Sequence, residues 1–488
     1  MLGRAFADDM TPTRGQLIKE DQFFWTHYVV AVLLGLLCVY IALERWQWLA
    51  SHRYPLDYDG FYYLQELSHR LARGTGYYHG FSPFFRGLAD LARLFDLTPA
   101  TTLNVWVWGS LLLLSVGFGL IGRSGRWWWL SPALALLVWL SDTLFYLHYG
   151  FLRQAGAFAM LVTGLALFRT HPPQRAGTGV LNRAGGLVLI VIAAVFHLFA
   201  GLVGLIFVLF DREMGNWRWR IGMALPLLAA SVYFLIPKVG PLAAGLTIAA
   251  RPAWEAARLA GQITPFETAE FWIYAAAGAG LAVVGVLNRR RSPLFWALVA
   301  LFALMVLPVW SQETGGFAYR LIRTAPSVLF LALAVGLGYA PAGEAGDRPF
   351  LPGLLGGVLA AVLVARLLLP VSLHPLGPSM APETLERHGP LLKAWIPEGT
   401  FVQAPHGIQF RVTYFLGRPT ARELPQGFKA EEQTYYIVGP EPPAGFACPD
   451  ITTVAEASPG LQCLRLDPWW YVWRVAPSEA AGTGSRHR

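Results

Sequence analysis

Long apolar runs separated by short polar segments dominate this chain from residue 28 to residue 373. A helix needs about 20 apolar residues to cross a bilayer, and nine runs come close to that length. The predicted spans are 28–46, 102–122, 128–145, 152–168, 221–237, 271–288, 294–310, 323–340 and 351–373. The pattern predicts an all-α polytopic membrane protein.

A further apolar run, Gly185 to Phe210, is about 39 Å long as a helix, which exceeds one upright span. Both flanks carry arginines, at 169, 175 and 183 and at 212, 218 and 220. If both flanks are cytoplasmic, the run enters the membrane and returns as two short helices with His197 near the tip. A single tilted helix is the alternative.

These runs give about eleven transmembrane helices, with the N-terminus cytoplasmic and the C-terminus outside. The arginines at 289–291 and at 123–126 then lie on the cytoplasmic side, as the positive-inside rule requires. Arginines in the first outer loop, residues 47–101, oppose the rule, although long loops count for less in it.

Composition supports this class. Of the 488 residues, 55% are hydrophobic and 14% are charged, and the mean hydropathy is +0.44; soluble domains are about 25% charged. The net charge of +8 comes largely from arginines in short loops, so it does not indicate a nucleic-acid partner. Asn-x-Ser/Thr sequons are absent, which favours a bacterial inner membrane over a secretory-pathway lumen.

The last part of the chain, residues 374–488, is polar and rich in Pro and Gly. We expect two domains, 1–373 in the membrane and 374–488 as a small α/β domain outside it, with a disordered tail from Ser478. The expected elements are a helix over 383–395 and strands over 400–403, 409–415, 434–438, 463–466 and 471–475.

The three cysteines differ in setting. Cys38 lies in the first apolar run and suits packing. Cys448 and Cys463 lie in the polar C-terminal segment. They either form a disulfide, which would place that segment in an oxidising compartment, or remain two free thiols.

The stretch Tyr54 to Tyr63 places two carboxylates, Asp57 and Asp59, among aromatic rings just beyond the first span. A carboxylate near a bilayer surface loses hydration, so its charge is costly without a partner. Two of them suggest a task, either accepting a proton or holding a cation. An aspartate pair in an ordinary turn is the alternative.

The rest of the first outer loop shows two apolar stripes at helical spacing. The first is Leu64, Leu67 and Leu71, and the second is Phe84, Leu88, Leu91 and Phe95. Each predicts an amphipathic juxtamembrane helix on the membrane surface, with packing against neighbouring loops as the alternative.

This combination resembles the GT-C glycosyltransferases. The likeness rests on the segment Asp57 to Tyr63, the long outer loop with its two helices, the layout of residues 28–373 and the C-terminal outer domain. It implies that Asp57 or Asp59 acts as the base or binds a divalent cation, Mg²⁺ or Mn²⁺. It also implies a polyprenyl-phosphate sugar donor.

Other polar residues are expected near the same face. Arg153 and Gln154 begin the fourth span, where the arginine either snorkels to headgroups or binds a phosphate or sugar. His197 is an ionisable group in an apolar run, which makes it a functional candidate; a satisfied core histidine is the alternative.

A second group precedes the span 323–340: Glu313, Tyr319, Arg320 and Arg323. On a continuing helix the two arginines share a face, which suits a phosphate. Anchoring at the interface is the alternative. Arg366, within the last apolar run, either snorkels or joins the same pocket.

The sequence contains no Walker A loop, Rossmann fingerprint or zinc pattern, so we expect no nucleotide cofactor. The function expected is inverting transfer of a sugar from a polyprenyl-phosphate donor to a glycan, lipid or protein. A lipid or solute transporter and a non-catalytic scaffold are the alternatives.

Overall fold

The structure is a computed structural model. It describes the backbone of residues 14–52, 54, 58–77, 82–123, 129, 131–169, 178–211, 216–235, 265–287, 292–306, 315–338, 357, 360–366, 368, 382–425, 427–442, 447–454 and 460–477. Within these ranges it describes the side chains except those of residues 14–24, 58–59, 122–123, 169, 178–180, 230–235, 265–268, 315–321, 337–338 and 406–407.

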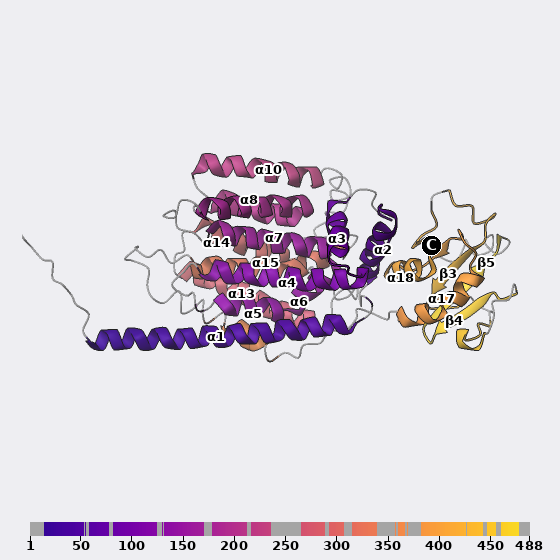
Figure 1. Ribbon diagram of the computed structural model, residues 1–488, viewed down its shortest axis with the longest axis horizontal. Helices are drawn as coiled ribbons and strands as arrows, with labels where there is room; N and C mark the ends of the chain where they lie inside the picture. Colours follow the sequence, from indigo (N-terminus) through magenta and orange to yellow (C-terminus); the bar gives the residue numbers. More distant parts are fainter. Residues whose placement is uncertain are drawn as a thin grey trace, which may run out of the picture.

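Most of the described chain forms a bundle of roughly parallel and antiparallel helices around one apolar core (Figure 1). The bundle comprises α1 (Arg14–Ser51), α4 (Pro99–Arg123), α5 (Ser131–Leu140), α6 (Asp142–Gly150), α7 (Leu152–Arg169), α8 (Thr178–Phe196), α9 (Leu198–Phe210), α10 (Trp217–Leu235), α13 (Pro265–Leu287), α14 (Pro293–Val306) and α15 (Gly315–Gly338).

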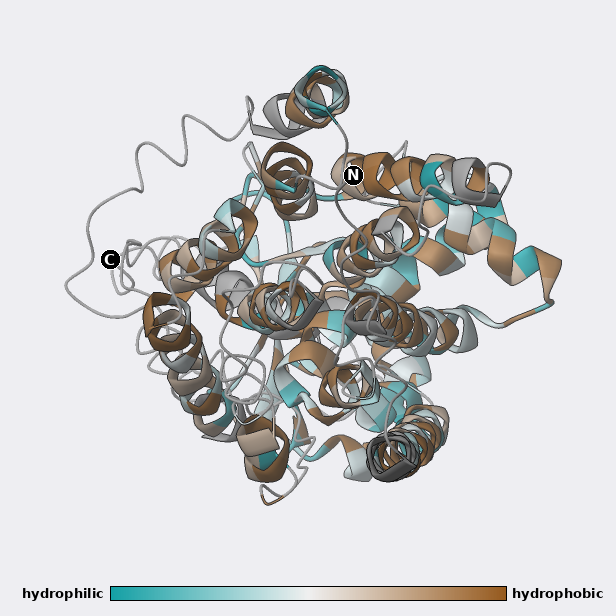
Figure 2. Ribbon diagram, turned by 90° about the vertical axis from the view of Figure 1, so that its left-hand side faces the viewer, coloured by the Kyte–Doolittle hydropathy of each residue, from teal (hydrophilic) through white to brown (hydrophobic). Residues whose placement is uncertain are grey.

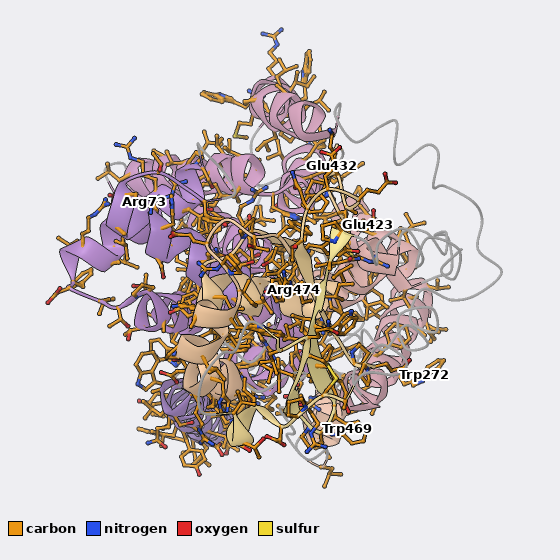
Figure 3. All side chains as sticks on the ribbon, turned by 90° about the vertical axis from the view of Figure 1, so that its right-hand side faces the viewer. Arg73, Trp272, Glu423, Glu432, Trp469 and Arg474 are labelled. Atoms are coloured by element: carbon orange, nitrogen blue, oxygen red, sulfur yellow. A yellow bond between two sulfur atoms is a disulfide. The ribbon has the colours of Figure 1, made fainter. Side chains whose placement is uncertain are left out.

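Two short helices, α2 (Tyr58–Arg73) and α3 (Pro83–Leu94), lie at one end of this bundle, and the C-terminal unit follows beyond them (Figure 1). We call this end the capped end. Figure 3 looks onto it, with Arg73 of α2 and Glu423 and Glu432 of the C-terminal unit facing outward.

The bundle has the dimensions and surface of a membrane domain. Among the described residues, three helices are long and apolar enough to cross a membrane: Trp25–Ser51, Pro99–Ile121 and Ala269–Leu287. Large apolar residues face outward on α1, where Leu33 is 60% exposed and Leu36 is 62% exposed, and hydrophobic residues dominate the helices seen end-on (Figure 2). The protein is therefore a multi-pass membrane protein, whereas the count of eleven crossings stays a prediction.

The region predicted as one span over 128–145 is instead two helices, so that prediction is wrong. α5 ends at Leu140, and Ser141 begins α6 by accepting a hydrogen bond from the Leu144 amide (3.1 Å). A second break at Phe151 bends α6 against α7 by 118°. A polar Ser-Asp pair inside the apolar run causes the first break, because serine at the N-cap satisfies a free backbone amide.

The long run Gly185 to Phe210 splits at His197, as predicted. α8 ends at Phe196 and α9 begins at Leu198. His197 has extended backbone angles, and its Nδ1 accepts a hydrogen bond from the Phe199 amide (3.3 Å). The histidine therefore acts locally as the cap of α9.

The two predicted amphipathic helices exist, and both bury their apolar stripes against the bundle. Leu64, Leu67 and Leu88 are at most 2% exposed, whereas Phe95 follows the end of α3 and is 61% exposed. Polar residues that lie off the α2 stripe are also buried, including Glu66 and Arg70, which pair at 3.1 Å. α2 is therefore enclosed on more than its apolar side.

The C-terminal unit is a small α/β structure, as predicted. Its elements are α17 (Pro382–Trp395), β1 (Val402–Gln403), α18 (His406–Leu416), β2 (Thr420–Ala421), β3 (Tyr435–Gly439), a 3₁₀ turn (Ile451–Thr453), β4 (Cys463–Asp467) and β5 (Trp470–Val475). The strands form one mixed sheet in the order β2-β1-β3-β5-β4, with β1 parallel to β2 and β3.

The segment 409–415 is helical, so its predicted strand is wrong. Its alternating apolar and polar residues suit a strand, but the helix has two buried faces. Ile408, Val412 and Leu416 recur at helical spacing and enter the core of the C-terminal unit. The other face packs on α2. Gly417 ends the helix with φ of +66°, which glycine adopts without steric cost.

Cys448 and Cys463 are joined by a disulfide, with sulfurs 1.94 Å apart, next to the β4–β5 hairpin. Cys38 is a free cysteine in α1. The predicted disordered tail from Ser478 lies outside the described residues.

Two glycines set the closest approach of α7 and α8. A Cβ on Gly186 would lie 2.6 Å from the Gly164 carbonyl oxygen, and a Cβ on Gly164 would lie 2.7 Å from that of Gly186. Small residues allow membrane helices to pack backbone against backbone. At Gly185, the neighbour of Gly186, a Cβ would meet no other atom within 4 Å.

We therefore expect Gly186→Ala to destabilise the protein by about 1–3 kcal/mol, since the helices must separate. Gly185→Ala is the matched control and should be neutral or slightly stabilising. The measurement is the apparent melting temperature of each purified variant in the same detergent. Equal shifts for the two variants would contradict this packing.

Candidate functional site

We call residues 55–60, which carry Asp57 and Asp59, the acidic segment. It lies in the chain between the end of α1 and the first turn of α2, at the capped end. Asp57 lies outside the described residues, and Asp59 lies in the first turn of α2 with its side chain outside the description. The neighbouring rings are described: Tyr62 of α2 contacts Phe410 of α18, with ring centroids 5.3 Å apart. The helix α2 therefore packs against α18 of the C-terminal unit.

Rings of α3 connect this segment to the break at His197. Tyr62 contacts Phe85 at 6.1 Å, and its neighbour Phe84 contacts Phe196 at 5.9 Å. Phe196 is the last residue of α8. Tyr62 of α2 and the break at His197 are thus separated by one short helix, although they are far apart in sequence.

Arg153 lies at the same break. Its Nε donates to the Phe196 carbonyl oxygen at 3.1 Å, and that residue precedes His197. The interaction satisfies a carbonyl at the end of α8, where helices leave such groups without a partner of their own. Arg153 is half-buried, so its guanidinium bridges the end of α8 and the start of α7.

Gln154 and Arg323 lie close together in the bundle, on α7 and α15. Gln154 donates from Nε2 to the Thr324 hydroxyl at 2.5 Å. Arg323 is 1% exposed, and its guanidinium lies 5.3 Å from the ring centroid of Tyr146, a cation–π geometry. Arg153 therefore lies beside the break at His197, and its neighbour Gln154 contacts α15 at the residue next to Arg323.

The remaining candidates are only partly described. Tyr319 and Arg320 lie on α15, which is helical from Gly315 to Gly338, with their side chains outside the description. Arg320 and Arg323 are three residues apart on this helix, as predicted, so they share a face. Glu313 lies outside the described residues.

Four charged residues that were not predicted as a group meet in the bundle. Asp142 Oδ1 accepts from Arg45 at 2.7 Å, and its Oδ2 lies 3.4 Å from Arg366. Arg366 also lies 3.5 Å from Glu270 Oε1. All four side chains are at most 4% exposed. Two cations and two anions balance, and we call this group the buried quartet.

Further hydrogen bonds support Glu270 and Arg366 of the quartet. Glu270 Oε2 accepts from the amide and the hydroxyl of Thr143, at 2.8 and 2.7 Å, and Glu270 Oε1 accepts from the Tyr274 hydroxyl. Arg366 donates to the Leu140 carbonyl at the end of α5. The quartet therefore joins α1, α6, α13 and the helical residues 360–366 at the break between α5 and α6.

The two carboxylates of the quartet can be picked out in the sequence, although they belong to no motif. Asp142 and Glu270 are carboxylates within or beside the predicted spans, and ionisable residues inside a membrane are functional candidates by default. Which arginine each one meets could not be read from the sequence, because the partners are remote; Arg45 and Asp142 lie 97 residues apart.

The predicted divalent cation rests on Asp57 and Asp59 alone. Among the residues that the structure describes, no three His, Cys, Asp or Glu side chains are grouped so that they could hold a metal ion. Carboxylate oxygens do suit Mg²⁺ and Mn²⁺.

No family model and no curated protein matches the sequence. Two solved structures of ArnT from Cupriavidus metallidurans are similar to this chain. The apo structure has a TM-score of 0.43 at 15% identity, and the structure bound to undecaprenyl phosphate has 0.40 at 13%. Each comparison covers 91% of this chain and 98% of the other.

The buried quartet gives a stability prediction. Asp142→Asn should destabilise the protein by about 3–5 kcal/mol, because it leaves two buried arginines facing one carboxylate. Adding Arg45→Gln should recover part of that loss. The measurement is a double-mutant cycle on apparent melting temperature.

The exposed pair Arg93 and Asp90 is the control, with nitrogen and oxygen 3.3 Å apart and side chains more than half exposed. The same cycle there should give a coupling of at most about 1 kcal/mol. A coupling no larger at Arg45 and Asp142 would contradict the assigned role.

Proposed function

We propose that this protein is an inverting glycosyltransferase of the GT-C type. It transfers a sugar from a polyprenyl-phosphate donor to a glycan, lipid or protein acceptor. The membrane is the bacterial inner membrane, with the N-terminus in the cytoplasm and the capped end in the periplasm.

The observation that carries this proposal is the location of the acidic segment. The helix α2, which begins within this segment, packs against the C-terminal unit and lies one short helix away from Arg153 and His197. The helix that begins within the acidic segment, the break at His197 and Arg153 therefore lie at one end of an apolar bundle (Figure 1). That arrangement suits a reaction between a lipid-borne donor and an acceptor arriving from outside the membrane.

The reaction is a single displacement. The acceptor hydroxyl oxygen attacks the anomeric carbon while the bond from that carbon to the phosphate oxygen breaks. The electron pair of the broken bond leaves with the polyprenyl phosphate, and the hydroxyl proton passes to Asp57 or Asp59 as general base. Attack from the face opposite the phosphate inverts the anomeric configuration.

The arginines would stabilise the leaving phosphate. Arg320 and Arg323 share a face of α15, and guanidinium groups bind phosphate through paired hydrogen bonds. Charge that develops on the phosphate is stabilised most where water is excluded. A divalent cation held by Asp57 and Asp59 would supply further charge stabilisation when bound.

Transport of a lipid or solute is the second candidate, and the buried quartet is the observation that favours it. Ionisable residues inside the membrane mark pathways in many transporters. The quartet is balanced in charge and its carboxylates accept several hydrogen bonds. This arrangement suits an anchor between helices better than a site that must release an ion.

The first test is transfer by purified protein in nanodiscs. Radiolabelled polyprenyl-phosphate sugars are the donors and a membrane lipid extract supplies acceptors. Wild type should turn over one donor, and Asp57→Asn or Asp59→Asn should lower the rate by about 10²–10⁴-fold, since the base is lost. Sensitivity to a chelator would assign the cation.

Asp90→Asn is the matched control, since Asp90 lies on α3 in the same loop and is exposed. It should keep the wild-type rate. If no donor is consumed while labelled lipid crosses the same vesicles, the transferase proposal fails and the transporter takes its place.

A further inference from the structure

The two rings that bracket the acidic segment meet the same side chain of the C-terminal unit. Tyr54 and Phe61 lie on either side of residues 55–60, which include both candidate carboxylates. The Phe415 ring of α18 lies 5.3 Å from the Tyr54 ring and 5.8 Å from the Phe61 ring, measured between centroids. Tyr54 and Phe61 also stack on each other at 6.1 Å. One ring thus contacts both ends of a short segment.

The contact is enclosed. Phe61 is fully buried, and its ring also meets Tyr414 at 5.9 Å. The guanidinium of Arg411 lies over the same ring at 5.3 Å, and Arg411 is 2% exposed. Edge-to-face rings and a cation above a ring prefer particular orientations, so this contact constrains direction as well as distance.

The face of α18 that points away from Tyr54 and Phe61 is also fixed by packing. This face, Ile408, Val412 and Leu416, lies in the core of the C-terminal unit, and each of these residues is at most 2% exposed. The position of Phe415 is therefore set by the sheet and helices of the C-terminal unit and not by its contacts with Tyr54 and Phe61.

We propose that Phe415 is a positioning residue for the proposed reaction, which fixes Tyr54 and Phe61, the rings on either side of the segment that carries Asp57 and Asp59. The inference rests on the proposed function and deepens it, because it makes the C-terminal unit part of the catalytic geometry. Displacing a reacting group by about 1 Å can slow a reaction about 10²-fold.

The test compares Phe415→Ala, Phe415→Tyr and Phe401→Ala in the full-length protein in nanodiscs. Phe401 is a buried ring of the same unit that contacts Phe428 and Tyr435 in a separate small core. Its loss therefore controls for general weakening of that unit. The first readout is amide hydrogen exchange of the peptide covering residues 52–64. The second is turnover of the polyprenyl-phosphate sugar that wild type consumes.

Phe415→Ala should speed exchange in this peptide by about 10-fold or more and lower kcat by about 10–100-fold, with the KM for the donor within about threefold. Phe415→Tyr should restore both values, and Phe401→Ala should change neither. General weakening of the C-terminal unit would change the two alanine variants alike.

Two outcomes would overturn the inference in different ways. If wild type turns over donor and Phe415→Ala leaves both exchange and kcat unchanged, the positioning role fails and the proposed function stands. If wild type consumes no donor, the proposed function fails and the catalytic role of Phe415 fails with it, whatever the exchange rates are.

Discussion

The charge balance of the buried quartet is the constraint on which the bundle depends. A charge inside an apolar bundle must be paired and hydrogen-bonded, since the cost of an isolated one exceeds the stability of most proteins. Asp142 and Glu270 meet this requirement only while α1, α6, α13 and residues 360–366 stay together. The quartet thereby fixes α6, and with it the sharp bend that begins α7 and presents Arg153 and Gln154 at one corner.

The helices could be predicted from the sequence because an apolar run has few other ways to satisfy its backbone in a membrane. The split at His197 followed from length and flanking charge. The strand predicted for 409–415 is wrong because α18 packs against other elements on two of its faces. A segment buried on two faces loses the one-sided periodicity by which a helix is recognised.

The sequence indicated which residues could belong to the candidate site, but it did not indicate which of them lie close together in the fold. Asp57, Asp59 and His197 stood out because ionisable groups are rare near apolar runs. The link between α2 and the break at His197 runs through Phe84 and Phe85 of α3, and of these two rings the sequence indicated only Phe84, as part of an amphipathic stripe. The quartet was missed for the same reason, since pairings between helices far apart in the chain leave no local pattern.

The contact between α18 and the acidic segment also bears on the order in which the protein is made. Chains leave the ribosome from the N-terminus, and domains fold as units in that order. Tyr54 and Phe61 are synthesised early, whereas Phe415 follows only after the whole bundle. The contacts of Phe415 with Tyr54 and Phe61 therefore form last, once the C-terminal unit has folded, so a half-made chain in the membrane lacks them.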